Sequence, residues 1–164
     1  MTAYDFDADR DAARITIRRA FAAPRDLVWT CYTQADLLDR WYAPAPLTTE
    51  TKSMEFREGG HWHFAMITPE GDRYWSRFDF DSIDPKESMV YRDGFSDADG
   101  RVSPDMPRSE ATMSFEDSPE GTIVHTVVRY ASPEDVDKVV GMGLKQGLEA
   151  TMGKLDDLLA ELTR

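Results

Sequence analysis

The sequence predicts an α+β domain in which a curved antiparallel sheet packs against one long C-terminal helix. The helix is expected from Ser132 to Arg164, because Ser132-Pro133-Glu134-Asp135 is a helix-start signal and apolar residues then recur at helical spacing. The sheet is expected between Leu47 and Tyr130, where apolar and polar residues alternate and short turn-like segments separate the runs. Such a sheet buries one of its faces on the helix.

The elements before the sheet follow from their own patterns. Residues 1–13 are polar and acid-rich, which predicts a flexible N-terminal segment and places the single domain at residues 14–164. A first strand is expected from Ile15 to Phe21, and Pro24 then opens a short helix. A second short helix is expected from Gln34 to Trp41. The chain then enters the meander.

The meander contributes about six strands, so the sheet is expected to have six to seven. Its runs of alternating residues are 47–56, 61–67, 73–83, 88–92, 110–115 and 122–130. One long loop remains, between Asp93 and Ser109. Loops of this length in small domains are often functional or mobile, so this one could cover a site as a lid.

Four glycines interrupt the apolar stripe of the C-terminal helix: Gly141, Gly143, Gly147 and Gly153. Each glycine costs about 1 kcal/mol relative to alanine inside a helix. Two explanations are open. The glycines could allow close packing on the sheet, or they could thin a helix that lines a ligand chamber.

Composition restricts the possible partners and the compartment. The formal charge of −12 argues against a nucleic-acid partner and against docking on an anionic membrane. The only cysteine, Cys31, excludes an internal disulfide and falls in an apolar helical pattern, which predicts a buried thiol. No apolar run is long enough to cross a membrane, and no secretory signal follows Met1. We therefore expect a cytoplasmic protein.

Bulky apolar side chains on the strands and the helix are the candidate ligand-binding residues. A curved sheet packed by a single helix is often not filled completely, which would leave an apolar pocket. The alternative is an ordinary dense core. The candidate lining residues are Trp62, Phe64, Met66, Phe78, Phe80, Met89, Tyr91, Met113 and Phe115 from the sheet, with Met142 and Leu148 from the helix.

No pattern identifies a catalytic residue, a metal site or a cofactor. His61 and His63 share a strand face and could join His125 around a metal. However, Trp62 and Phe64 are the natural inward residues, which turns both histidines toward solvent. The strand residues Arg77, Asp79 and Asp81, with nearby Glu87, are expected on the wet face or in cross-strand pairs.

The chain resembles the START-like, or SRPBCC, superfamily, and within it the bacterial activator-of-heat-shock-protein-90-ATPase homologue-like family. The resemblance runs from about Ile15 to Leu162. It is carried by Arg19-Ala20-Phe21, Ala23-Pro24, Leu27-Val28-Trp29, Leu37, Trp41-Tyr42-Ala43-Pro44, Phe56-Arg57-Glu58-Gly59-Gly60, Trp62, Met66, Ile83-Asp84-Pro85-Lys86-Glu87, Val90-Tyr91, Phe115, Gly121-Thr122 and Gly141-Met142.

This resemblance implies a helix-grip fold, in which the sheet wraps the C-terminal helix around an internal cavity. Relatives bind lipids, sterols, polyketides or other apolar molecules, and some catalyse cyclisation or aromatisation. The family has no universal catalytic residue to carry over. Trp75 departs from the small residue expected in its strand and would narrow the cavity.

Three functions are compatible with this reading. The first is non-catalytic binding of a small apolar molecule between the sheet and the long helix. The second is an enzyme, a cyclase, hydrolase or isomerase, which would need a polar cavity residue with a perturbed pKa. The third is stimulation of a chaperone ATPase through an exposed patch. The sequence leaves a homodimer open.

Overall fold

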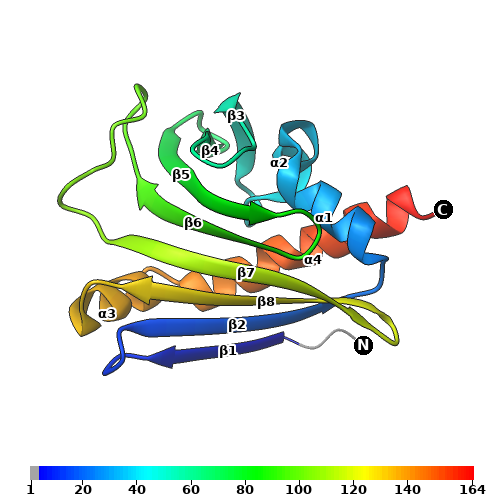
Figure 1. The fold of residues 1–164 in the computed structure, drawn as a ribbon. Coiled ribbons are helices and arrows are strands. Elements are labelled where there is room, and N and C mark those ends of the chain that lie inside the picture. Colours follow the sequence, from blue (N-terminus) through cyan, green and yellow to red (C-terminus); the bar gives the residue numbers. More distant parts are fainter. Residues whose placement is uncertain (1–3) are drawn as a thin grey trace.

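The computed structural model describes residues 4–164 as one antiparallel sheet wrapped around the C-terminal helices (Figure 1). The sheet has eight strands in the order β1-β2-β8-β7-β6-β5-β4-β3. The strands are β1 (Tyr4–Asp9), β2 (Arg14–Phe21), β3 (Thr48–Met54), β4 (His61–Ile67), β5 (Arg73–Asp84), β6 (Ser88–Phe95), β7 (Arg108–Ser118) and β8 (Gly121–Tyr130). The helices are α1 (Arg25–Thr33), α2 (Ala35–Trp41), α3 (Pro133–Gly141) and α4 (Leu144–Leu162).

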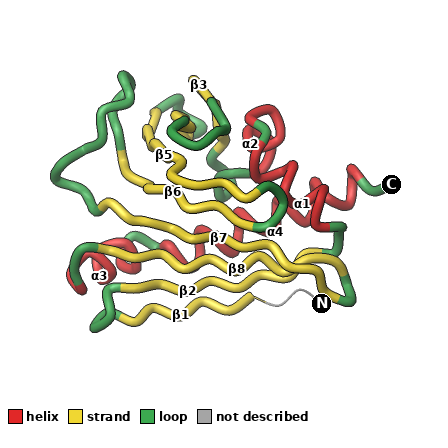
Figure 2. Tube along the Cα trace, viewed as in Figure 1, coloured by secondary structure: helices red, strands yellow, loops and turns green. Residues whose placement is uncertain are grey.

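This arrangement confirms the predicted α+β helix-grip fold. Strands β3 to β8 form an antiparallel meander, and β2 pairs with β8 at its end. The pair of short helices α1 and α2 carries the chain from β2 to the opposite edge of the sheet, where β3 begins. Figure 2 shows these two helices gathered at one end, while α3 and α4 run along the sheet.

The N-terminal segment, expected to be flexible, instead forms the eighth strand. β1 pairs with β2 from Tyr4–Arg19 to Asp9–Arg14. Tyr4 and Phe6 are half-buried against the core, whereas Asp5 and Asp7, which alternate with them, are exposed. This alternation of half-buried and exposed residues is the ordinary pattern of an edge strand with one solvent-exposed face. The many acidic residues of the segment made the pattern difficult to recognise in the sequence. Residues 1–3 of the expected flexible segment lie outside the described residues.

The C-terminal helix is also divided, where a single helix was expected. Ser132 caps α3 as predicted, its Oγ accepting a hydrogen bond from the Asp135 backbone nitrogen at 3.2 Å. The chain then turns at Gly143, whose φ of +90° is left-handed and ends the regular helix. α4 begins at the next residue, Leu144. The long helix of the fold is therefore α4 alone.

Alanine substitutions at two neighbouring glycines should have opposite effects on stability. A Cβ at Gly141 would meet no atom within 4 Å and would lie in ordinary helical backbone, so Gly141→Ala should stabilise the protein by about 0.5–1 kcal/mol. Gly143→Ala has equally open space but a left-handed φ, and should destabilise by about 1 kcal/mol. Urea unfolding of both variants measures these changes. Equal effects would contradict the division at Gly143.

Aromatic side chains of α1 and α2 pack into the core at the end of the sheet that these helices cover. Trp29 packs edge-on against Phe115 with ring centroids 5.1 Å apart, and Tyr32 packs edge-on against Trp41 at 4.9 Å. Cys31 is fully buried, as expected, and burial raises the pKa of its thiol to about 11. This thiol is therefore a packing group with little thiolate at neutral pH.

Candidate functional site

A cavity of about 300 Å³ lies at the other end of the fold, between the sheet and the junction of α3 with α4. Its lining comes from strands β4 to β8, from both C-terminal helices and from the segment after α2. The lining residues are Tyr42, Pro44, Phe64, Met66, Tyr74, Ser76, Phe78, Asp93, Gly94, Phe95, Pro107, Ser109, Tyr130, Val139, Met142, Gly143, Leu144, Gly147, Leu148 and Thr151. Tyr74 and Met142 are the most exposed large apolar residues among them and mark its rim.

One row of residues across four strands forms the sheet wall of this cavity. In the antiparallel register Phe78 pairs with Asp93, Asp93 pairs with Ser109, and Ser109 pairs with Tyr130. Paired residues share a face of the sheet, so all four side chains point toward the helices. The row is apolar at Phe78 and polar at the other three positions. A mainly apolar cavity thus contains one compact polar strip.

Asp93 is the single charged residue in the cavity lining. Burial raises the pKa of its carboxyl to about 7, and this effect exceeds the opposing effects of Arg108 and of a backbone hydrogen bond from Gly94. Its neighbour Tyr130 is also affected: burial and the nearby Asp93 raise the pKa of its phenol, while a side-chain hydrogen bond with Ser109 lowers it. At neutral pH, Asp93 can therefore exist in either protonation state.

The helix wall of the cavity contains two of the four helical glycines. Gly143 and Gly147 line the space, and a Cβ at Gly147 would approach only Pro44, at 4.0 Å. Added Cβ atoms at Gly141 and Gly153 would likewise meet nothing within 4 Å. Close packing on the sheet therefore does not explain these glycines. At Gly143 and Gly147 their effect is a thinner helix surface facing the cavity.

The structure divides the predicted ligand-binding residues between two places. Phe64, Met66, Phe78, Met142 and Leu148 line the large cavity. Trp62, Phe80, Met89, Tyr91 and Met113 do not; they surround a separate space of about 20 Å³, which also touches Phe78. A space of that size holds about one water molecule. Phe115 lines neither.

Aromatic side chains from the α1–α2 end explain this division. Tyr32 packs on Phe115 at 5.5 Å, and Tyr42 packs on Trp62 at 5.0 Å. Tyr42 and Phe78 touch both spaces and so form the partition between them. The six predicted residues outside the large cavity are all buried in the core. Beyond Tyr42, the helix-facing side of the sheet is filled by protein.

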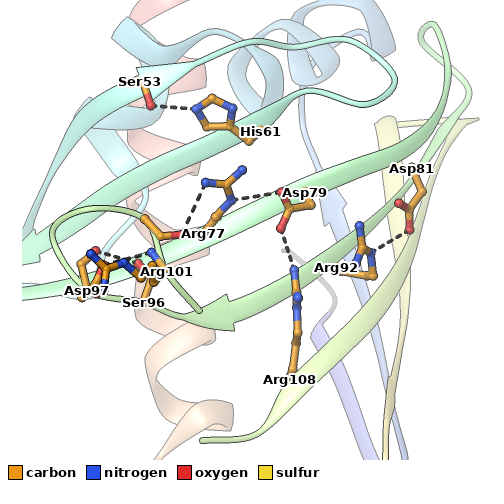
Figure 3. A network of polar contacts seen from close by, with 11 residues as sticks. Ser53, His61, Arg77, Asp79, Asp81, Arg92, Ser96, Asp97, Arg101 and Arg108 are labelled. Carbon is orange, nitrogen blue, oxygen red and sulfur yellow. Dashed lines mark hydrogen bonds and ion pairs between the residues drawn. The ribbon is translucent and has the colours of Figure 1, made fainter. Parts of the chain in front are cut away.

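The opposite face of the sheet carries the predicted strand charges in ion pairs (Figure 3). Arg77 Nε donates to Asp79 at 3.0 Å, and Arg108 Nη2 donates to the other oxygen of the same carboxylate at 2.6 Å. Arg92 on β6 pairs with Asp81 on β5 at 3.3 Å. None of these residues lines the large cavity. Their charges stabilise the outer face.

The histidines also lie outside the cavity, but His63 is buried rather than exposed. The Nε2 of His63 lies 3.0 Å from the Asp97 carbonyl oxygen, and its ring is covered by Trp75 at 4.8 Å. His61 Nε2 lies 2.8 Å from Ser53 Oγ. Within residues 4–164, no three potential metal ligands form a group. Trp75 packs beside His63 on the outer face of the sheet and does not line the cavity. It therefore does not narrow the cavity.

The loop expected between Asp93 and Ser109 is shorter than predicted, because β6 continues to Phe95 and β7 begins at Arg108. Its tip is attached to the outer face of the sheet: His63 contacts Asp97, and Arg77 Nη1 donates to the Gly100 carbonyl oxygen at 3.4 Å. Phe95 and Pro107, on either side of the loop, line the cavity. The loop tip is thus not positioned as a lid.

Comparison with known families identifies the family of this chain. The sequence profile described as "Activator of Hsp90 ATPase homolog 1-like protein" matches residues 22–160. The chain belongs to this family. No match was found among curated proteins.

Solved structures of other proteins have the same fold as this family member. A crystal structure of protein Ms6760 from Mycobacterium smegmatis is 29% identical, with a TM-score of 0.86, covering 94% of this chain and 95% of that one. A solution structure of a protein from Arthrobacter aurescens is 25% identical, with a TM-score of 0.89 and coverage of 96% and 91%. The AHSA1 protein from Silicibacter pomeroyi shares the fold at 21% identity, with a TM-score of 0.71 and coverage of 90% and 98%.

For this member of the Hsp90-activator-homologue family, sequence reasoning missed the polar strip of Asp93, Ser109 and Tyr130. The signal was present, because Asp93 continues the inward positions of Met89 and Tyr91 at a period of two. Ending the strand at Arg92 concealed it. Finally, none of the helices in the described part of the chain is both long enough and apolar enough to span a bilayer.

Proposed function

We propose that this protein binds a small, mainly apolar molecule in the cavity between the sheet and the α3–α4 junction. The observation that carries the proposal is the cavity itself: about 300 Å³, walled mainly by aromatic and aliphatic side chains, with a few polar groups that include the strip of Asp93, Ser109 and Tyr130. Cavities of this size and lining are the usual shape of small-molecule sites. The family fold, whose relatives commonly hold apolar ligands, supports the same conclusion.

Native mass spectrometry of the protein purified from the cells that naturally produce it tests this directly. We expect an organic mass that stays bound under gentle ionisation and is lost on denaturation. A neutral fluorophore, N-phenyl-1-naphthylamine, provides a second test that needs no natural ligand. Its emission should rise on entering the apolar cavity. Absence of both a bound mass and fluorophore binding would overturn the proposal.

Filling the cavity from the helix side should abolish binding without unfolding the protein. Gly147→Leu places a side chain into the cavity from α4, where the nearest atom to its Cβ is 4.0 Å away. We expect at least about tenfold weaker binding of N-phenyl-1-naphthylamine, because the added side chain occupies ligand volume. Gly153→Leu is the matched control, since Gly153 lies on the same helix outside the cavity lining. Equal affinities of the two variants would place the ligand elsewhere.

The carboxyl of Asp93 in the cavity lining favours the alternative function, which is catalysis. A carboxyl with a pKa of about 7 inside an apolar cavity can both give and take a proton near neutral pH. Incubating recovered ligand with fresh protein separates the two functions by mass. An unchanged mass supports binding alone, whereas a new mass that Asp93→Asn prevents supports catalysis.

A further inference from the structure

The position of Asp93 within the cavity limits the chemistry of the ligand. Asp93 lies in the row of Phe78, Ser109 and Tyr130, with its side chain on the helix-facing side of the sheet. The lining contains no lysine, arginine or histidine. The cavity therefore offers a carboxyl group to its occupant and no side-chain cation.

No cation among residues 4–164 forms an ion pair with this carboxyl. In the described part of the chain, Asp93 makes no ion pair within 4.0 Å. Arg108, the cation that affects it, begins β7 opposite Gly94, and its guanidinium is bound to Asp79 on the outer face. The phenols of Tyr42, Tyr91 and Tyr130 are the other titratable groups near Asp93. A cationic group on the ligand would supply the missing partner.

The aromatic walls of the cavity also suit a cationic group on the ligand. Phe78 lies beside Asp93 in the row, and Tyr42, Phe64, Phe95 and Tyr130 contribute further aromatic rings to the lining. Aromatic faces attract ammonium groups, and they do so most strongly where water is excluded. The hydroxyl of Ser109 can accept one more N–H from an ammonium that binds the neighbouring carboxylate.

We propose that the ligand is an apolar amine whose ammonium group binds the Asp93 carboxylate, while its hydrocarbon body fills the space toward Leu148 and Met66. This inference rests on the proposed binding function and specifies the ligand class. Asp93 acts as the residue that selects for a cation. An anionic ligand of the same shape would face an unpaired carboxylate and should be rejected.

The ionisation of Asp93 gives the proposal a pH signature. An ammonium pairs only with the ionised carboxylate, and the pKa of Asp93 is about 7. Amine affinity should therefore be high at pH 8.5 and fall at pH 5.5, while simple aliphatic amines stay protonated at both values. A neutral ligand lacks this dependence.

Calorimetric titration with three probes of one shape tests the inference: 2-(1-naphthyl)ethylamine, 2-(1-naphthyl)ethanol and 1-naphthylacetate. At pH 8.5 we expect the amine to bind about tenfold tighter than the alcohol, as one charge-assisted hydrogen bond allows, and the acetate to bind weakest. Most of the preference for the amine should disappear at pH 5.5. Asp93→Asn should remove it at both pH values and leave the alcohol's affinity within about threefold. Asp84→Asn, an exposed carboxylate on β5 outside the cavity, should keep the preference.

The possible failures are distinguishable. If the amine and the alcohol bind wild type equally well, the cavity binds apolar molecules but Asp93 does not select a cation, and this inference is wrong. A preference for the acetate, or a preference for the amine that survives Asp93→Asn, also overturns it. If no probe and no N-phenyl-1-naphthylamine binds, and native mass spectrometry finds no bound organic mass, the proposed function itself fails.

Discussion

Replacing Asp156 with alanine is expected to destabilise the protein by about 3 kcal/mol, the largest effect we predict for a single substitution. Asp156 on α4 binds Arg19 on β2 through two contacts, 2.5 Å to Nη2 and 3.1 Å to Nη1. The Arg19 side chain is only 6% exposed. Without Asp156, its charge keeps, among the described residues, the Ala20 carbonyl oxygen and the face of the Phe21 ring as partners. Urea unfolding at pH 7 should show the loss, and the melting temperature should fall by roughly 6–12 °C.

The control for this prediction is Glu161, which lies further along the same helix. Glu161 pairs with Arg40 at 2.9 Å, but both side chains are about half exposed. Glu161→Ala should therefore change the free energy of unfolding by less than about 1 kcal/mol. The double variant Arg19→Met with Asp156→Leu removes both charges and should recover much of the stability that the single substitution loses. Similar losses in Asp156→Ala and Glu161→Ala would show that the Arg19 pair is not a buried interaction.

The fold could be predicted from the sequence because each element carries a local signal. The Ser132 cap, the period-two runs of the meander and the Pro24 helix start are properties of short segments, and the structure contains each of them. The errors were also local. Acidic residues concealed the apolar alternation of Tyr4 and Phe6, and a helical stripe conceals a break that one left-handed glycine produces.

The cavity was harder to locate because its position depends on contacts between distant segments. Alternation correctly placed Trp62 and Phe64 on the same face of β4, and their rings are stacked at 3.8 Å. Yet only Phe64 lines the cavity, since Tyr42, which follows α2, packs against Trp62 and closes that end. No pattern within β4 records where the segment after α2 will lie. The same limit applies to Phe115, which Trp29 and Tyr32 of α1 contact, and to Phe80, whose ring packs on Phe56.

Replacing Asp93 with asparagine is expected to stabilise the protein at pH 8 by on the order of 2 kcal/mol. Burial raises the pKa of Asp93 to about 7 in the folded state, whereas an unfolded aspartate titrates near pH 4. Between these values the folded protein holds more protons, so this group's contribution to stability falls as pH rises through about 4 to 7. The difference of about three between the folded and unfolded pKa values of Asp93 corresponds to about 4 kcal/mol of stability. We halve this figure because the side chain keeps some solvent contact in the cavity.

The prediction is a difference between two pH values, which separates it from a general effect of the substitution. Asp93→Asn and wild type should have equal free energies of unfolding, within about 0.5 kcal/mol, at pH 4, where both side chains are neutral in the folded protein. The gap should open as the pH rises from about 4 to about 7 in urea titrations and stay constant above that range. Asp84→Asn, which removes an exposed carboxylate, should track wild type throughout. A variant less stable than wild type at pH 8 would mean that the Asp93 carboxylate is held in its charged form, because the protein then stabilises the ion that burial is expected to disfavour.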